Sequence, residues 1–585
     1  MQVRTRALVL GALVVGSVAA VDPAGLAPFG PAKWLVISTL GALGVGVTLW
    51  STRGRADRRS WRAWAALVAL VTLSALMSGD LPTALLGQPD RHLGVLTWLL
   101  LWALFSAGQR LDRADVRVVT RAIATAAAVL GGWSVVELAG GHLVAIATDS
   151  RRLTGPFGSA AFLGAASCLL LPVAAGIAAD RGSPRAWRII GALGATTTLV
   201  ALIGSGSRAA WLGSLVATLA LLVVRRSPGW RAARPAARRA GWRPIAVGLG
   251  MVIAVCCVLA PRLGEITGRP HGATSRIDEW TVAARVITDH PLIGVGPEGY
   301  RIAAPEGIDR HYERSYGRDA ALPDRAHSAP LDVALIGGLP AAALFVALVG
   351  FVVWRALGLM RTGQGMAVDA GLATGVIAYA VQQLLLFPLA EVDPVWWLCC
   401  GIVVTRSRPP ATASTAPTAS TRRQRHRTVA ASVTAVTIAA LALVAGTLDV
   451  AADRLARRAL DAAPDTGVDD ADRAIRLRPD DVRYRLVGAV VHSRRGSLAD
   501  VDLALDQIDV ARRWSPNDPL VRDQQAVLLA QRASITGTTH DIAASLAAWR
   551  ALVFSDPHRA RWQLGLGRAA ALAGDVAQAR AAWRV

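Results

Sequence analysis

Long apolar runs alternate with short, arginine-rich polar segments over most of the chain. A helix needs about 20 apolar residues to cross a bilayer, and a series of runs reaches or approaches that length. The runs centre on residues 7–21, 33–50, 63–78, 93–107, 118–138, 159–179, 188–204, 209–224, 244–260, 331–354, 367–389, 395–405 and 429–447. This pattern predicts an all-α, polytopic membrane protein with about 12–13 transmembrane helices.

Changes in composition divide the chain into parts. Residues 1–405 form the predicted membrane core, which includes a long loop at 261–330. Residues 406–428 form a low-complexity linker, and a final transmembrane helix is expected at 429–447. We therefore expect the last helix to stand apart from the core in sequence and to lead into a different kind of domain.

The segment 450–585 is rich in Asp, Arg and Ala at helical spacing. Pro479, Pro516 and Pro557 mark three similar stretches, 37 and 41 residues apart. This is close to the roughly 34-residue period of tetratricopeptide helix pairs, which bind peptides or proteins on a concave face. The prediction is a soluble tetratricopeptide-like repeat domain that can bind a protein partner. The alternative is an irregular helical domain without a partner.

The charge distribution separates a membrane protein from a nucleic-acid-binding one. The net charge is +22 and hydrophobic residues make up 53% of the chain, with a mean hydropathy of +0.40. The basic residues lie in short clusters between apolar runs, as in cytoplasmic membrane loops, so we expect no nucleic-acid partner. Lys33 is the only lysine, so the positive charge comes almost entirely from arginine.

The same charges predict an orientation. If the N-terminus is cytoplasmic, the arginine-rich loops all fall on the cytoplasmic side, as the positive-inside rule requires. The turn at 204–211, the loop at 261–330 and the segment from 450 onward then lie outside the cell membrane. Residues 1–20 also resemble a cleavable signal peptide, but cleavage would leave this orientation unchanged.

The cysteines carry no predicted chemistry. They lie inside apolar runs without metal-ligand or disulfide spacing, where cysteine usually acts as a small hydrophobic residue. They are Cys168, Cys256, Cys257, Cys399 and Cys400.

Three polar residues next to predicted membrane helices are candidates for function. Arg208 lies between two apolar helices, where a charge is costly, and it either reaches to the lipid headgroups or serves a site. Arg276 begins a predicted amphipathic helix over 277–288, where a cation opposes the helix dipole and therefore does not stabilise the helix. Arginine is suited to bidentate binding of phosphate.

His327 lies just before the apolar run at 331–354. A neutral imidazole can accept a proton from a hydroxyl group. No metal-ligand spacing surrounds it, so we expect neither a metal nor a cofactor. Two arginines and a histidine at the outer boundary suggest a site for an anionic lipid-linked donor, whereas a structural role for the histidine is the alternative.

Several stretches in order resemble the O-antigen ligase-like family of membrane glycosyltransferases. They are "LLGQPDRHLG" (85–94), "RLTGPFGSAAFLG" (152–164), "SGSRAAWLG" (205–213), "SRIDEWTVAARVITDHPLIGVGPEGY" (275–300) and "AHSAPLDVALIGGLPA" (326–341). The last is similar to the family's histidine motif, except that Ala341 stands at its final small or polar position. The stretch "GVGPEG" is otherwise typical of a tight turn.

The resemblance implies an inverting, metal-independent transfer of a glycan from an undecaprenyl-pyrophosphate carrier on the extracytoplasmic face of the cell membrane. It implies that Arg208 and Arg276 hold the pyrophosphate and that His327 orients or deprotonates the acceptor hydroxyl. Arg91 and Arg152 are further candidates for contacts in the outer vestibule where the substrate would bind. His92 is expected to be only a neighbour of Arg91, without a role of its own. The acceptor would be an envelope polymer, a lipid or a protein.

Other functions remain open at this stage. Ligases and polymerases of lipid-linked repeat units would use the same site. A transporter or flippase of lipid-linked sugars is the rival class, although transporters place charged sites near the bilayer midplane and often contain repeated halves. Cell-shape and division polymerases have a similar architecture but lack the histidine motif.

Overall fold

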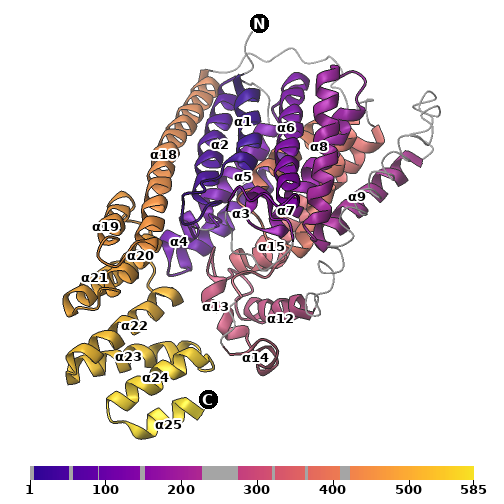
Figure 1. Cartoon of the computed structure of the whole chain (residues 1–585). Helices are drawn as coiled ribbons and strands as arrows, with labels where there is room; N and C mark the ends of the chain where they lie inside the picture. Colours follow the sequence, from indigo (N-terminus) through magenta and orange to yellow (C-terminus); the bar gives the residue numbers. More distant parts are fainter. Residues whose placement is uncertain are drawn as a thin grey trace.

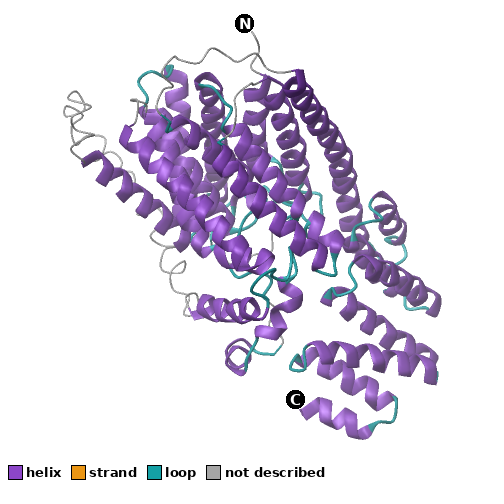
Figure 2. Ribbon diagram, turned by 180° about the vertical axis from the view of Figure 1, so that it is seen from behind, coloured by secondary structure: helices purple, strands orange, loops and turns teal. Residues whose placement is uncertain are grey.

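The computed structural model describes residues 5–51, 57–89, 91–144, 152–226, 274–318, 323–362, 367–408 and 422–584. These residues form helices joined by turns and loops, with no strand among them (Figure 2). The all-α prediction is confirmed. The run predicted at 244–260, with Cys256 and Cys257, lies outside the described residues.

Most of the predicted apolar runs are helices of one bundle (Figure 1). Its helices are α1 (Thr5–Ala19), α2 (Pro31–Ser51), α3 (Arg58–Met77), α5 (Val95–Gly108), α6 (Arg113–Leu138), α7 (Ala160–Ala179), α8 (Arg185–Gly204), α9 (Arg208–Arg226), α15 (Ala329–Thr362), α16 (Ala367–Gln382), α17 (Asp393–Arg406) and α18 (Arg422–Asp461). Short elements between them are α4 (Leu81–Leu86) and the single turns η1 (Gly155–Phe157) and η3 (Gln383–Leu385).

Within the described ranges, nine helices are long and apolar enough to cross a membrane. The helices α1 and α5 are apolar but shorter, and α17 has only 14 residues. The prediction of a polytopic membrane protein is therefore confirmed, while the described helices that meet the length criterion are fewer than the predicted runs.

The bundle interior is apolar and tightly packed. Trp64, Phe105 and Trp397 come from three different helices, and their rings meet edge to face or tilted with centroids 4.6 to 6.1 Å apart. Aromatic pairs in this geometry add stability beyond the area they bury. Gly108 of α5 and Gly401 of α17 lie so close to the opposite backbone that a Cβ would meet a carbonyl oxygen at 2.3 and 2.1 Å. Small residues of this kind allow membrane helices to approach closely.

One end of the bundle carries three helices of the long loop. The loop helices α12 (Thr274–Asp289), α13 (Tyr300–Gly307) and α14 (Arg310–Tyr316) lie there, at the end opposite the N-terminus (Figure 1). We call this end the loop face. The C-terminal helices extend away from the same end of the bundle.

The C-terminal helices pack in order, each against the next in sequence. They are α19 (Val468–Leu477), α20 (Val482–Ser493), α21 (Leu498–Trp514), α22 (Pro519–Thr536), α23 (Thr539–Ser555), α24 (Ala560–Leu572) and α25 (Val576–Arg584). Several begin at a capping side chain: Ser497 and Thr538, for example, accept a backbone N–H in the first turn of their helices. Such caps fix where each helix starts. We call this helical array the repeat domain, after the sequence prediction; that its helices repeat a tetratricopeptide-like unit stays a prediction.

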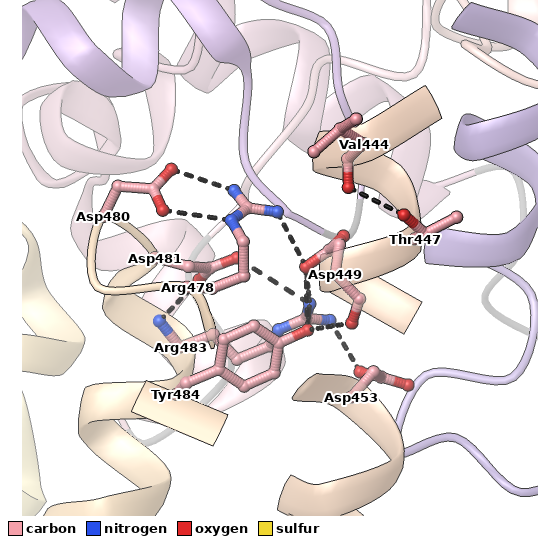
Figure 3. Close-up of polar contacts among 9 residues, drawn as sticks. All are labelled: Val444, Thr447, Asp449, Asp453, Arg478, Asp480, Asp481, Arg483 and Tyr484. Atoms are coloured by element: carbon pink, nitrogen blue, oxygen red, sulfur yellow. Dashed lines mark hydrogen bonds and ion pairs between the residues drawn. The ribbon is translucent and has the colours of Figure 1, made fainter. Parts of the chain in front are cut away.

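The helix α18 joins the bundle to the repeat domain without a break. It packs along α2 and continues to Asp461. Where it leaves the bundle, Arg478 lies 3.0 Å from Asp449, Arg483 lies 3.3 Å from Asp453, and the Tyr484 hydroxyl donates to Asp449 (Figure 3). These contacts fasten the first repeat helices to the end of α18.

Candidate active site

The predicted helix in the long loop is present as α12, and it brings Arg276 to the bundle. The Arg276 Nη1 atom donates to the backbone carbonyl of Leu385 at 2.7 Å and to that of His327 at 3.2 Å. Its guanidinium therefore bridges η3 and the segment that carries His327. The sequence suggested that Arg276 does not stabilise its own helix, and the structure shows that it contacts two other segments instead.

His327 has an unusual backbone and a half-buried ring. Its φ is +50°, a left-handed conformation that is uncommon outside glycine and stays only where the surroundings hold it. The ring lies 5.3 Å from that of Phe387, and its Nδ1 is buried without a hydrogen-bond partner in the described part of the chain. Burial, and next the charge of Arg276, lower the pKa of His327 to about 4. The imidazole is therefore neutral at neutral pH.

Two more arginines surround the same phenylalanine. The guanidinium carbon of Arg91 lies 5.0 Å from the Phe387 ring centre, and that of Arg325 lies 5.9 Å from it. Arg91 also forms an ion pair with Asp324. We call Arg91, Arg276, Arg325, His327 and Phe387 the histidine cluster. It combines one neutral base with three cations.

Arg325 is held rigidly. It is 3% exposed, and its Nη2 lies 2.5 Å from Glu298 in an ion pair that is buried on both sides. Glu298 belongs to the "GVGPEG" stretch, which does form a turn in which the Gly299 N–H donates to Gly296. Sequence reasoning found the turn but missed Glu298, because its role depends on an arginine 27 residues away.

Phe387 was also missed. It lies in an apolar stretch after η3, where nothing in the sequence distinguishes it from a core residue. Glu279, one turn after Arg276 on α12, is a further titratable group of this region. Burial raises its pKa to about 7, although the charge of Arg276 acts in the opposite direction.

Two glycine-containing motifs of the loop face, in the stretches 275–300 and 326–341, pack closely against each other. Gly338 interrupts α15 with φ +76° and ψ 178°, a conformation that is essentially restricted to glycine. A Cβ on Gly338 would lie 2.3 Å from the carbonyl oxygen of Leu292, and one on Gly294 would lie 2.3 Å from that of Leu335. The Val295 N–H donates to Leu335 across this contact. The kink of α15 therefore fits against the 291–296 segment and fixes both relative to His327.

The departure at Ala341 has a simple packing consequence. Ala341 is fully buried, and its Cβ lies 2.7 Å from the position that a Cβ on Gly337 would occupy. Residue 337 therefore has no room for a side chain beside Ala341.

Arg152 and Arg208 lie around a second feature, the turn at 204–207. The Arg152 Nε donates to the Ser205 carbonyl at 2.7 Å, and the Leu153 N–H donates to Gly204 at 3.0 Å. Arg208 follows the turn as the first residue of α9, and it is exposed. These two predicted site residues therefore share one turn, separate from the histidine cluster.

Two contacts relate this turn to the histidine cluster. Phe162, in the same motif as Arg152, meets Phe387 edge to face with ring centres 5.9 Å apart. The helix α9, which Arg208 begins, contacts η3, whose last residue accepts a hydrogen bond from Arg276. The structure thus brings Arg91, Arg276 and His327 together and places Arg152 and Arg208 on the adjoining side.

His92 follows Arg91 in the chain. Its ring stacks on Trp34 with centroids 4.8 Å apart, and burial lowers its pKa to about 3. In the described ranges, His, Cys, Asp and Glu side chains form no group of three that could hold a metal ion.

Comparison with known proteins defines the class further. The fold defines an all-α polytopic membrane protein whose polar site lies at one end of the bundle. Residues 193–346 match the family described as O-antigen ligase, so this part of the chain is similar to that family. The match includes Arg208, Arg276 and His327. No curated protein matches the chain.

The predicted resemblance to the O-antigen ligase family is therefore confirmed over residues 193–346, whereas the tetratricopeptide-like character of the C-terminal helices stays a prediction. The family match supports a membrane glycan ligase- or polymerase-type function, and the family in general implies a lipid-linked glycan substrate. Arg91, Arg152 and the repeat domain lie outside the matched region, so their assignment depends on the geometry described above.

Proposed function

We propose that the protein transfers a glycan from an undecaprenyl-pyrophosphate carrier to an acceptor hydroxyl on the extracytoplasmic face of the cell membrane. The observation that carries the proposal is the histidine cluster, in which a neutral histidine lies among Arg91, Arg276 and Arg325. A general base beside several cations is the combination required by a reaction that deprotonates a hydroxyl and releases a pyrophosphate.

The reaction is a single displacement. The acceptor oxygen attacks the anomeric carbon of the donor sugar from the side opposite the pyrophosphate, so the new glycosidic bond forms with inversion. The bond between that carbon and the pyrophosphate oxygen breaks, and undecaprenyl pyrophosphate leaves with the bonding electrons. His327 takes the proton of the acceptor hydroxyl, because its imidazole is neutral in the resting protein.

The arginines have the complementary role. Arg208 and Arg276 bind the pyrophosphate and stabilise the charge that develops on the leaving oxygen, and Arg91 and Arg152 contribute from the walls of the same vestibule. Arg276 is already fixed by its bonds to His327 and Leu385, so little ordering is needed when the donor binds. This role requires no metal ion.

Donor binding would also change the pKa of His327. The charges of Arg276, Arg91 and Arg325 lower the pKa of His327 in the empty site, in addition to the effect of burial. A bound pyrophosphate would offset these charges and raise the pKa of His327 toward its ordinary value near 6.5. His327 then becomes a stronger base when the leaving group is in place.

The charge distribution supports an orientation with the loop face outside. The arginine-rich loops are predicted to be cytoplasmic, which would leave the loop face on the side where lipid-linked glycans meet their acceptors. The helices α12 to α14 and the repeat domain lie at one end of the molecule, so one orientation would expose them together. Ligase and polymerase activity differ only in the acceptor, which is an envelope polymer, a lipid, a protein or a second lipid-linked glycan.

The direct test is glycan transfer in proteoliposomes with purified protein and undecaprenyl-pyrophosphate glycan, with and without a chelator. We expect undecaprenyl pyrophosphate to be released and the linked product to identify the acceptor. Arg276→Ala and Arg208→Ala should each reduce the rate by about 100-fold, as removal of a charge-stabilising donor does elsewhere. Arg276→Lys and Arg208→Lys are the matched controls, because they keep the charge without the bidentate fork. Movement of intact donor across the bilayer without cleavage would identify a transporter instead.

A further inference from the structure

Arg301, in α13, connects the membrane core to the repeat domain. Its Nη1 lies 2.9 Å from an Asp518 carboxylate oxygen, and the two side chains are 11% and 9% exposed. The Gln88 amide oxygen accepts from Arg301 Nε and Nη2 at 2.5 and 3.1 Å, in the amide orientation that satisfies both of its polar atoms. One guanidinium therefore joins three segments that are far apart in sequence.

Polar contacts around Arg301 complete an interface. Asp80 is 5% exposed and accepts a hydrogen bond from the Ser515 hydroxyl at 3.3 Å, while Ser515 lies 3.1 Å from the Thr83 hydroxyl. Asp80 is the N-cap of α4 and Thr83 lies in that helix, whereas Ser515 and Asp518 come from the turn between α21 and α22. A buried ion pair with additional hydrogen bonds holds its partners in one geometry far better than an exposed pair.

The interface lies one step from the histidine cluster along two routes. In the first, the Gln88 carbonyl accepts the backbone N–H groups of Arg91 and His92 at 2.9 and 2.7 Å, so Gln88 forms the turn that presents Arg91. In the second, α13 begins just after Glu298, which holds Arg325. Arg301 is therefore linked to the turn that presents Arg91 and to the segment whose Glu298 pairs with Arg325.

We infer that the repeat domain is a working part of the catalytic site: its Asp518 holds Arg301, and Arg301 in turn positions the Arg91 turn and the Glu298–Arg325 pair around His327. Arg301 and Asp518 are positioning residues, which touch neither donor nor acceptor. The catalytic part of this inference rests on the proposed function, whereas the docking contact does not. Its consequence is that a ligand on the repeat domain can alter transfer without entering the site.

The test compares Asp518→Asn with Asp523→Asn in the full-length protein. Asparagine at 518 loses the charge that holds Arg301 but keeps the side-chain oxygen that caps α22 through Leu520. Asp523 lies on the same helix and forms an ion pair of the same 2.9 Å length with Arg561, inside the repeat domain. It is therefore a matched control that leaves the docking contact intact.

Two measurements are made on each variant. One is the kcat and KM of glycan transfer in proteoliposomes, and the other is hydrogen exchange at the Arg91 and His92 amides, which bond to Gln88. For Asp518→Asn we expect kcat to fall about tenfold, because small misplacements of site residues are costly, together with faster exchange at both amides. Arg301→Lys should fall between this variant and the wild type. Asp523→Asn should match the wild type in both measurements.

The outcomes separate this inference from the proposed function. Wild-type exchange and kcat in Asp518→Asn would overturn the inference, and so would an equal fall in kcat for Asp523→Asn. Faster exchange in Asp518→Asn with unchanged kcat would also overturn it, since docking would then not position the site. If the wild type transfers no glycan, the proposed function fails, and the exchange data still decide whether Asp518 holds the Arg91 turn.

Discussion

The membrane bundle and the repeat domain are built from the same element, the α-helix, but they are held together differently. In the bundle, apolar side chains and close glycine contacts fill the interior, as at Gly108 and Gly401. Asp–Arg pairs of the bundle lie at helix ends, as between Arg406 of α17 and Asp369 of α16 at 2.6 Å. In the repeat domain, such pairs join α22 to two other helices: Arg532 with Asp502 of α21 at 3.2 Å, and Asp523 with Arg561 of α24 at 2.9 Å.

The difference indicates where a charged side chain is a sign of function. A charge in the apolar bundle is costly, so charges that gather at its edge, as in the histidine cluster, need a reason to be there. An exposed ion pair between repeat helices contributes little, because water solvates both partners well. Single substitutions should therefore have large effects in the cluster and small effects at exposed pairs in the repeats, with the Arg301 interface between these limits.

The largest effect is expected for His327→Ala. It removes the proposed base but leaves the arginines, so the transfer rate in proteoliposomes should fall by at least about 100-fold. Donor binding, measured by equilibrium filtration with labelled carrier, should change far less. A variant that keeps more than a tenth of the activity would show that His327 is only structural, and the contrast between the two regions would then lose its main support.

The next largest effect is expected for Gly338→Ala. The new Cβ would lie 2.3 Å from the Leu292 carbonyl oxygen in a backbone conformation reserved for glycine. We expect a loss of about 1–3 kcal/mol of stability, measured as a lower unfolding temperature in detergent, together with reduced transfer. Gly350→Ala, in the same helix, is the control, since a Cβ there meets nothing within 4 Å. Equal behaviour of the two variants would contradict the close packing of the two motifs.

The pH dependence gives a moderate effect with a defined sign. His327 accepts a proton only when it is neutral, so activity should be present above its pKa and be lost as the pH falls through it. Since kcat/KM reports the free enzyme, its acidic limb should lie near pH 4, at the lowered pKa of His327. The limb of kcat, which reports the donor complex, should lie at higher pH because the bound pyrophosphate offsets the arginines. If the acidic limbs of kcat and kcat/KM lay at the same pH, donor binding would not raise the pKa of His327.

The smallest effect is expected for Asp502→Asn in the repeat domain. The pair with Arg532 is partly exposed on both sides, at 46% and 35%, so its loss should change stability by no more than about 1 kcal/mol. Thermal unfolding and transfer should both resemble the wild type. A large loss of activity would show that exposed pairs of the repeats also support the site.

Much of the architecture was predictable from the sequence. Apolar length gave the helices of the bundle, because any segment of about 20 apolar residues has few alternatives to a buried or membrane-crossing helix. Ordered motifs indicated the family and singled out Arg208, Arg276 and His327. Short local patterns also gave the helix α12 and the turn in "GVGPEG". Each of these inferences depends on residues that are near one another in the chain.

Tertiary structure decided how the parts of the site meet. Nothing in the sequence distinguishes Phe387 from a core residue, but in the structure Arg91, Arg325 and His327 lie around its ring. Arg276 and Leu385 are 109 residues apart in sequence, and no local pattern pairs them. Asp518 and Arg301, which form an ion pair, are even further apart in sequence. The sequence alone determined which segments become helices, because hydrophobicity and capping act locally. Only packing determined which arginines face the histidine, because burial and ion pairing depend on neighbours that folding brings together from distant parts of the chain.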